Sequence, residues 1–153
     1  MTSRSEQILI AAARLFAERG YGATGIDDIG AEVGVSGPAI YWHFSGKQAL
    51  LAAMLTRVSE RLLANGRECV ATATDDRAAL AALVHMHVEF ALDEPDLIVV
   101  QARELSHLDV AQTHDVRALQ RQYVDVWVDV VQRLHPRVAR ARLVAAVQAA
   151  IGL

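Results

Sequence analysis

The sequence predicts an all-α fold, and three observations support this prediction. Apolar residues recur at intervals of three or four along most of the 153 positions, as they do on the buried face of a helix. No segment shows the alternation of apolar and polar residues that is typical of a half-buried strand. Glycine or proline stands near several expected helix ends, including Gly20, Gly34 and Pro136.

Residues 24–51, TGIDDIGAEVGVSGPAIYWHFSGKQALL, follow a first expected helix over residues 6–19 and predict two short helices joined by a tight turn. Thr24 is expected to cap the first of the two, whose buried face carries Ile26, Ile29 and Val33. Gly34 is expected to end that helix, because glycine adopts a left-handed conformation at little cost. The pattern indicates a helix-turn-helix.

The second short helix is expected to begin at Ser36, whose hydroxyl can cap its free N–H groups. Ile40 and Phe44 are four residues apart and are expected to face inward. The outward arc then carries small residues at the tip of the helix and hydrogen-bonding aromatic side chains behind them. Such a helix has the character of one that enters the major groove of DNA.

The segments from IAAARLFAERGYGATGIDDIGAEVGVS to IYWHFSGKQALL, over the first fifty or so positions, resemble the TetR family of bacterial transcription repressors. The resemblance implies a three-helix DNA-binding head and a helical body that senses a ligand and dimerises. One departure from the family pattern is Gly37-Pro38-Ala39, where the family usually carries Lys-Gly-Thr or a similar sequence. The tip of this helix therefore has few side chains that can hydrogen-bond a base edge.

On this basis we expect residues 1–46 to form the head and residues 47–153 to form the body. Lys47 is the only lysine of the chain and lies where the family places a phosphate-contacting lysine. The residues expected to contact DNA are Thr24, Ser36, Gly37, Ala39, Tyr41, Trp42, His43 and Lys47. Two such heads are expected to bind palindromic half-sites of an operator about 34–36 Å apart.

The charge of the head is unusual for a DNA-binding domain. Residues 1–50 carry four basic and five acidic side chains, and the formal net charge of the chain is −3. Binding therefore has to depend on where individual groups lie, and we expect Arg4 to act from a mobile arm.

Further helices are expected over residues 46–71, 77–92, 96–107, 115–134 and 136–153. Their large side chains alternate with polar groups, which a plain helical core would also produce. The resemblance implies a ligand cavity among these segments, with Met86, Phe90, Arg103, Tyr123 and Trp127 as the expected lining. The effector would be a small lipophilic compound, such as a fatty acyl or acyl-CoA molecule.

Several other classes are disfavoured by the sequence. We expect no catalytic site, cofactor or metal, because Glu104 with His107 and His85 with Glu89 are isolated pairs and no phosphate-binding loop or nucleophile motif occurs. The N-terminus lacks a signal peptide, no apolar run is long enough to span a membrane, and the single cysteine is Cys69, so a cytoplasmic location is expected.

The sequence thus predicts a ligand-responsive, homodimeric transcriptional repressor. Two alternatives stay open, namely a helical DNA-binding accessory protein without a small-molecule ligand and a helical metalloenzyme. Because residues 136–153 end on Ile-Gly-Leu without a cap, we also expect that the final helix of the family lies beyond residue 153.

Overall fold

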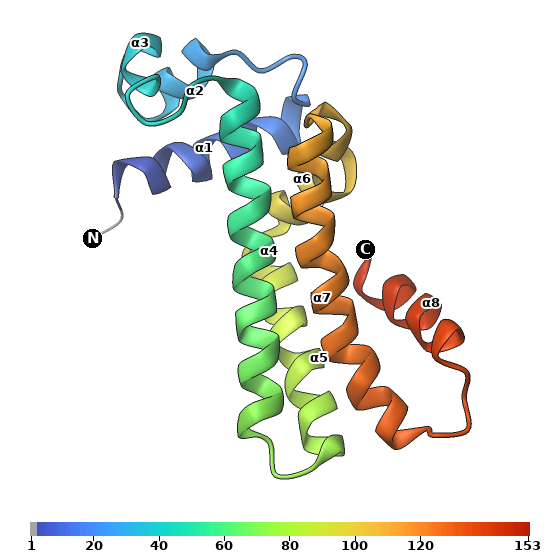
Figure 1. The fold of residues 1–153 in the computed structure, drawn as a ribbon. Helices are drawn as coiled ribbons and strands as arrows, with labels where there is room; N and C mark the ends of the chain where they lie inside the picture. Colours follow the sequence, from blue (N-terminus) through green and yellow to red (C-terminus); the bar gives the residue numbers. More distant parts are fainter. Residues whose placement is uncertain (1–2) are drawn as a thin grey trace. The chain divides into compact units, whose positions relative to one another are not determined.

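The computed structural model describes residues 3–153, and it confirms the all-α prediction. Within that range every regular element is a helix and no strand occurs. In order, the elements are α1 (Arg4–Arg19), α2 (Ile26–Glu32), α3 (Gly37–Ile40), α4 (Lys47–Thr72), α5 (Asp76–Asp93), α6 (Pro95–Arg103), the 3-10 helix η1 (Leu105–His107), α7 (Val110–Leu134) and α8 (Arg140–Ile151) (Figure 1).

The chain forms two compact units, each built from stretches that are separated in sequence. The first contains the described residues up to Thr56 together with Pro95–Thr113, and the second contains Arg57–Glu94 together with His114–Leu153. Residues 95–113, which carry α6 and η1, therefore belong with the N-terminal helices.

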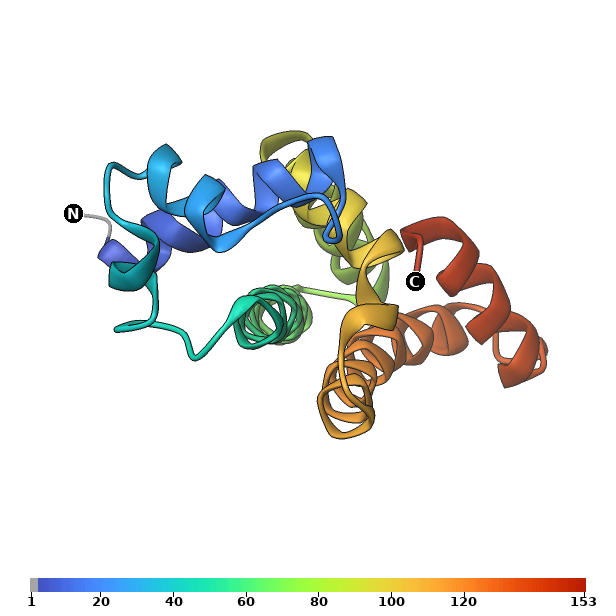
Figure 2. The ribbon, with the colours of Figure 1, turned by 90° about the horizontal axis from the view of Figure 1, so that it is seen from above.

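The first unit is organised around α1. This helix begins with a reciprocal cap, in which the Ser3 hydroxyl accepts from the Glu6 N–H and the Glu6 carboxylate accepts from the Ser3 N–H. It ends at Gly20, whose φ of 85° suits glycine. Its buried face includes Ile8, Leu15 and Phe16. The helix packs against α2 and α6, and Figure 2 shows α6, in yellow, beside α1, in blue.

The second unit is formed by the C-terminal part of α4 with α5, α7 and α8. Its core includes Leu62, Leu83, Val128 and Leu143. Glycine is a poor helix former, yet α4 runs through the Asn65-Gly66 pair. Gly66 is buried, and a Cβ atom there would lie 3.0 Å from Cε2 of Tyr123. The missing side chain therefore lets the Tyr123 ring pack directly on α4.

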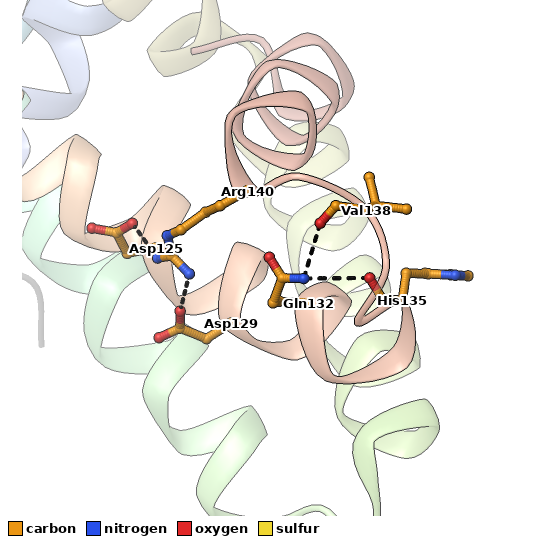
Figure 3. A network of polar contacts seen from close by, with 6 residues as sticks. All are labelled: Asp125, Asp129, Gln132, His135, Val138 and Arg140. Atoms are coloured by element: carbon orange, nitrogen blue, oxygen red, sulfur yellow. Dashed lines mark hydrogen bonds and ion pairs between the residues drawn. The ribbon is translucent and has the colours of Figure 1, made fainter.

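The connection between α7 and α8 differs from the sequence prediction. Pro136 does not open the last helix, because residues 136–138 form a turn and α8 begins at Arg140. The Gln132 side-chain amide donates to the backbone carbonyls of His135 and Val138 at 3.3 and 3.1 Å and so stabilises the turn (Figure 3). Arg140 then bridges Asp125 and Asp129 of α7 at 2.9 and 2.7 Å.

Candidate functional site

The turn between α2 and α3 depends on two glycines. Gly34 follows the end of α2 with a φ of +70°, as its position in the sequence predicts. Gly30 was missed by the sequence analysis, and it is the more tightly constrained of the two. A Cβ atom at Gly30 would lie 2.7 Å from the carbonyl oxygen of Val35, and the Val35 N–H donates to the Gly30 carbonyl at 2.9 Å. The turn therefore closes onto the backbone of α2.

The second short helix ends at Ile40, earlier than the sequence predicts, and the exposed aromatic side chains follow it. Trp42 is 88% exposed, Tyr41 is 56% exposed and His43 is also exposed, all in the turn that follows α3. Ser36 and Ala39 lie on the same short segment, the former exposed and the latter half-buried. The Ser36 hydroxyl makes no capping hydrogen bond, so the expected side-chain cap is wrong.

Gly37 lies in a different environment from the one that the sequence suggests. It is buried, and a Cβ atom there would overlap Oδ1 of Asp27 in α2 at 1.8 Å. A larger residue at this position would therefore displace the Asp27 side chain, whereas the nearest backbone atom, Cα of Asp27, would lie 3.6 Å away.

Thr24 also faces the interior. It is 1% exposed, and its hydroxyl donates to the carbonyls of Gly20 and Leu15 at 2.9 and 3.3 Å. The residue that caps α2 is Gly25, whose N–H donates to the Asp28 carboxylate at 2.8 Å. The expected cap by Thr24 is therefore wrong, because its hydroxyl joins the end of α1 to the following loop.

Lys47 is turned toward the α1–α2 loop. Its ammonium donates to the carbonyls of Tyr21 and Thr24 at 2.7 and 2.9 Å and lies 4.2 Å from the centre of the Tyr21 ring. A lysine ammonium has three N–H donors. Two of them are thus used on backbone carbonyls, and one is left over.

The first turn of α1 touches both parts of the helix-turn-helix. The Arg4 guanidinium donates to the Val33 carbonyl at 3.3 Å, at the end of α2, and the Ser5 hydroxyl lies 3.0 Å from Nδ1 of His43. Arg4 is the first residue of α1, so its expected place on a mobile arm is wrong.

Buried aromatic rings form a cluster in the second unit. Tyr123, Trp127 and Phe90 surround His87, and each of the three ring centroids lies 6.0 or 6.1 Å from that of the imidazole. The Tyr123 oxygen is 3.0 Å from Nδ1 of His87. The indole N–H of Trp127 is buried and makes no hydrogen bond of ordinary geometry within the described chain. We call these four residues the ring cluster.

Burial changes the acid–base behaviour of the ring cluster. It lowers the pKa of His87, an effect opposed by a hydrogen bond to the Ile151 carbonyl. It raises the pKa of Tyr123 to about 12, although the nearby Trp127 indole opposes the rise. In the tautomer whose other ring nitrogen donates to Ile151, Nδ1 of a neutral His87 accepts a hydrogen bond from the Tyr123 hydroxyl. Both residues are therefore neutral near pH 7.

Of the expected ligand residues, the structure brings Phe90, Tyr123 and Trp127 together. Met86, on α5, is half-buried in the same unit. Arg103 is exposed on α6 and belongs to the first unit. His87 was not among the expected lining residues, although its three-residue spacing from Phe90 places both on one face of α5.

The two acidic–histidine pairs singled out in the sequence are ion pairs between neighbours on the chain. Nε2 of His107 lies 3.2 Å from Glu104, and Nε2 of His85 lies 3.1 Å from Glu89. Across residues 3–153 no group of three His, Cys, Asp or Glu side chains is placed to hold a metal ion. In the same range no helix is long and apolar enough to cross a membrane.

Two short helices joined by a glycine turn and followed by exposed aromatic side chains define a helix-turn-helix protein. Residues 8–54 match the family model for bacterial regulatory proteins of the tetR family, and residues 73–151 match that for the tetracyclin repressor-like C-terminal domain. The chain therefore belongs to the TetR family.

Curated relatives include both an activator and repressors. The chain is 42% identical over 87 residues to the transcriptional activator FasR of Mycolicibacterium smegmatis, covering 57% of this chain and 40% of that protein. It is 30% identical over 132 residues to the repressor KstR2 of Rhodococcus jostii, covering 86% of this chain and 65% of that protein. The chain thus spans less than two thirds of the length of these relatives.

Solved structures share the fold. A TetR-family regulator from Bordetella parapertussis matches with a TM-score of 0.91 and 26% identity over 99% of this chain and 80% of that chain. The crystal structure of AibR in complex with isovaleryl coenzyme A and operator DNA matches with a TM-score of 0.83 and 19% identity, over 98% and 83% of the two chains.

Proposed function

We propose that this protein is a ligand-responsive, DNA-binding transcriptional repressor that acts as a homodimer on a palindromic operator. The observation that carries the proposal is the exposure of Tyr41, Trp42 and His43 in the turn that follows α3. Large exposed aromatic and hydrogen-bonding side chains at the end of a short helix are suited to the edge of a DNA groove. In this proposal residues 1–46 form the DNA-binding head and residues 47–153 the body.

The proposed DNA contacts differ in kind. Ser36, Tyr41, Trp42 and His43 carry exposed polar groups for phosphates or base edges, and Ala39 approaches the bases. Gly37 and Thr24 support the interface from within, because both are buried against neighbouring elements. Lys47 uses its remaining N–H on a phosphate.

A titration with fluorescein-labelled DNA from the region flanking the gene tests this proposal. Ala39→Glu is expected to abolish binding, because it places a carboxylate next to the phosphates and bases. Ala64→Glu, an exposed change within α4, is the matched control and leaves binding unchanged. Binding of Ala39→Glu with wild-type affinity would show that α3 does not face the DNA.

Lys47→Ala separates a phosphate contact from a supporting role. If the ammonium neutralises one phosphate, the slope of log K against log salt falls by about 0.9 for each head. If the lysine acts through its bonds to Tyr21 and Thr24, affinity falls and the slope stays the same.

We propose that the effector is a small lipophilic compound that binds at the ring cluster. The buried indole N–H of Trp127 makes no hydrogen bond of ordinary geometry within the described chain, and a ligand oxygen can supply a better-placed acceptor. The fold neighbour AibR was solved with isovaleryl coenzyme A, which makes acyl-CoA compounds the first class to test. To release the operator, the effector has to bind the DNA-free state more tightly than the DNA-bound state.

The two tryptophans, Trp42 and Trp127, provide a matched pair for the effector test. Acyl-CoA compounds, beginning with isovaleryl-CoA, are added to the protein–operator complex and the anisotropy is followed. Trp127→Phe removes the indole N–H and is expected to weaken the effector response. Trp42→Phe changes a proposed DNA contact and is expected to leave the effector affinity of the DNA-free protein unchanged. Equal responses in both variants would remove the ring cluster from the effector site, and no response by wild type to any lipophilic compound would favour the DNA-binding accessory protein.

The resemblance to the activator FasR favours activation as a second candidate. A reporter gene placed behind the bound DNA distinguishes the two directions. Expression that rises when the protein is removed supports a repressor, and expression that falls supports an activator.

A further inference from the structure

The two ends of the helix-turn-helix are joined by a set of contacts outside it. The segment of residues 25–46 is preceded by the α1–α2 loop and followed by the start of α4. Lys47, the first residue of α4, donates to the carbonyls of Tyr21 and Thr24 in that loop. The helix-turn-helix is thus a stretch of chain whose ends are tied to each other by one ammonium group.

A third segment, far along the sequence, binds both of these ends. The imidazole of His107, in η1, stacks on the Tyr21 ring with centroids 4.5 Å apart and an interplanar angle of 22°. The backbone carbonyl of His107 accepts from the Gln48 side-chain amide at 3.0 Å. One residue of η1 therefore contacts the α1–α2 loop with its ring and the start of α4 with its carbonyl.

A buried carboxylate orients the imidazole. Glu104 is 7% exposed, and its Oε2 lies 3.2 Å from Nε2 of His107. A carboxylate is costly to bury unless it is paired and hydrogen-bonded. The pair therefore favours the ring position in which His107 covers Tyr21.

Tyr21 is the common member of these contacts. Its ring meets the Lys47 ammonium at 4.2 Å, the His107 ring at 4.5 Å and the Phe16 ring at 5.3 Å from centroid to centroid. Attraction between a cation and an aromatic face adds to the stacking. All of these contacts are made by the Tyr21 ring, and no hydrogen bond of its hydroxyl is described.

We propose that Tyr21 and His107 are positioning residues for operator recognition, acting as a clamp that holds the two ends of the helix-turn-helix in a fixed relation. The proposal rests on the proposed DNA-binding function. The internal contacts of the helix-turn-helix, such as those of Gly30 with Val35, do not involve the clamp. Loss of the clamp leaves the reading helix intact and loosens its placement.

A loosely placed helix can still meet a single half-site, because it adjusts to that site alone. Two heads on an operator have to match two half-sites at a fixed spacing. The clamp should therefore contribute to the ratio of operator affinity to half-site affinity, whereas a general loss of folding lowers both affinities.

The test measures that ratio for two disruptive variants and two controls. His107→Ala and Tyr21→Leu remove the stacked rings, and we expect the ratio to fall about tenfold, within the usual range of couplings between sites. Tyr21→Phe retains the ring and His114→Ala removes an exposed imidazole elsewhere. Both controls are expected to keep the wild-type ratio.

Hydrogen exchange followed by mass spectrometry provides a readout that needs no DNA. In His107→Ala we expect faster exchange in peptides covering residues 20–25 and 47–51, with wild-type exchange over residues 26–33. This pattern also shows that the variant is folded.

The results separate the possible failures. Equal losses of operator and half-site affinity, or an unchanged ratio and unchanged exchange in His107→Ala, would overturn the clamp. If wild-type protein binds no DNA from the region flanking the gene, the proposed function is wrong, and the proposed role of the clamp in operator recognition is wrong as well.

Discussion

The helix-turn-helix and the ring cluster are built on opposite principles. In the helix-turn-helix the decisive contacts join residues close in sequence, such as Gly30 with Val35 and Asp27 with Gly37. In the ring cluster, His87 and Phe90 of α5 meet Tyr123 and Trp127 of α7. The first is a local structure with an exposed polar face, and the second is a half-buried imidazole held among buried rings from two helices that are distant in sequence.

This difference determines how each region responds to substitution. A local structure fails when its backbone geometry is disturbed, because few other contacts can compensate. A buried cluster fails when a hydrogen-bonding group loses its partner, because desolvation has already removed water from the remaining atom. Three variants examine these expectations, in order of decreasing effect.

Gly30→Ala is expected to have the largest effect. A Cβ atom 2.7 Å from the Val35 carbonyl meets backbone rather than a flexible side chain, so the turn has to open. Overpacking of this kind lowers the free energy of unfolding by about 1–3 kcal/mol, and DNA binding should be lost with it. Urea denaturation and DNA titration measure the two effects.

Gly22→Ala is the matched control, because a Cβ atom there meets nothing within 4 Å. Wild-type stability of Gly30→Ala, with DNA binding retained, would show that the close approach at the turn is not required.

The second variant, Tyr123→Phe, removes the hydroxyl next to His87. It leaves Nδ1 of His87 without its partner at 3.0 Å, which is expected to lower the free energy of unfolding by about 1–3 kcal/mol near pH 7. Tyr41→Phe, an exposed change of the same chemistry, is the control and leaves stability unchanged. A Tyr123→Phe protein as stable as wild type would mean that water or another group satisfies His87.

The ring cluster also predicts how stability depends on pH. The folded pKa of His87 lies below its ordinary 6.5, so the unfolded chain takes up the proton more readily and stability falls as the pH drops through 6.5. The folded pKa of Tyr123 is about 12, against an ordinary 10.0, so the unfolded chain loses the proton first and stability falls between pH 10 and 12. Urea denaturation across this range should show the alkaline loss in wild type and a smaller one in Tyr123→Phe.

The helix-turn-helix could be predicted from the sequence because its signals are local. The apolar spacing and Gly34 indicate the helices and the turn, and the all-α fold follows from the same periodicity. The environments of Thr24, Gly37 and Lys47 could not be predicted, because they depend on which neighbouring backbone each group meets. A threonine before a helix usually caps it, and here the hydroxyl of Thr24 finds closer acceptors at the end of α1.

The contacts between helices could not be predicted from the sequence for a related reason. Periodicity indicates that Tyr123 and Trp127 share a face of α7, but it carries no information on which helix covers that face. The same holds for η1, which packs with the N-terminal helices although it stands between α6 and α7 in the chain. The contact of His107 with Tyr21 is a consequence of that packing and has no signal in the local sequence.

The smallest effect is expected at the connection between α7 and α8, which is held by exposed groups. Arg140 bridges two carboxylates one turn apart on α7 (Figure 3), but all three side chains are about half exposed to solvent. Water and salt screen such pairs, so Arg140→Ala should lower the melting temperature by only about 1 °C at low ionic strength and by less at high ionic strength. Arg142 lies on the same helix and no ion pair is described for it, so Arg142→Ala is the control and should show no salt-dependent change in melting temperature.

The Gln132 amide stabilises the turn independently of charge. Amide exchange over residues 135–139 should therefore stay slow in Arg140→Ala and become faster in Gln132→Ala. Faster exchange in Arg140→Ala alone would instead assign the connection to the ion pairs, and the exposed charges would then have a larger role here than their solvation predicts.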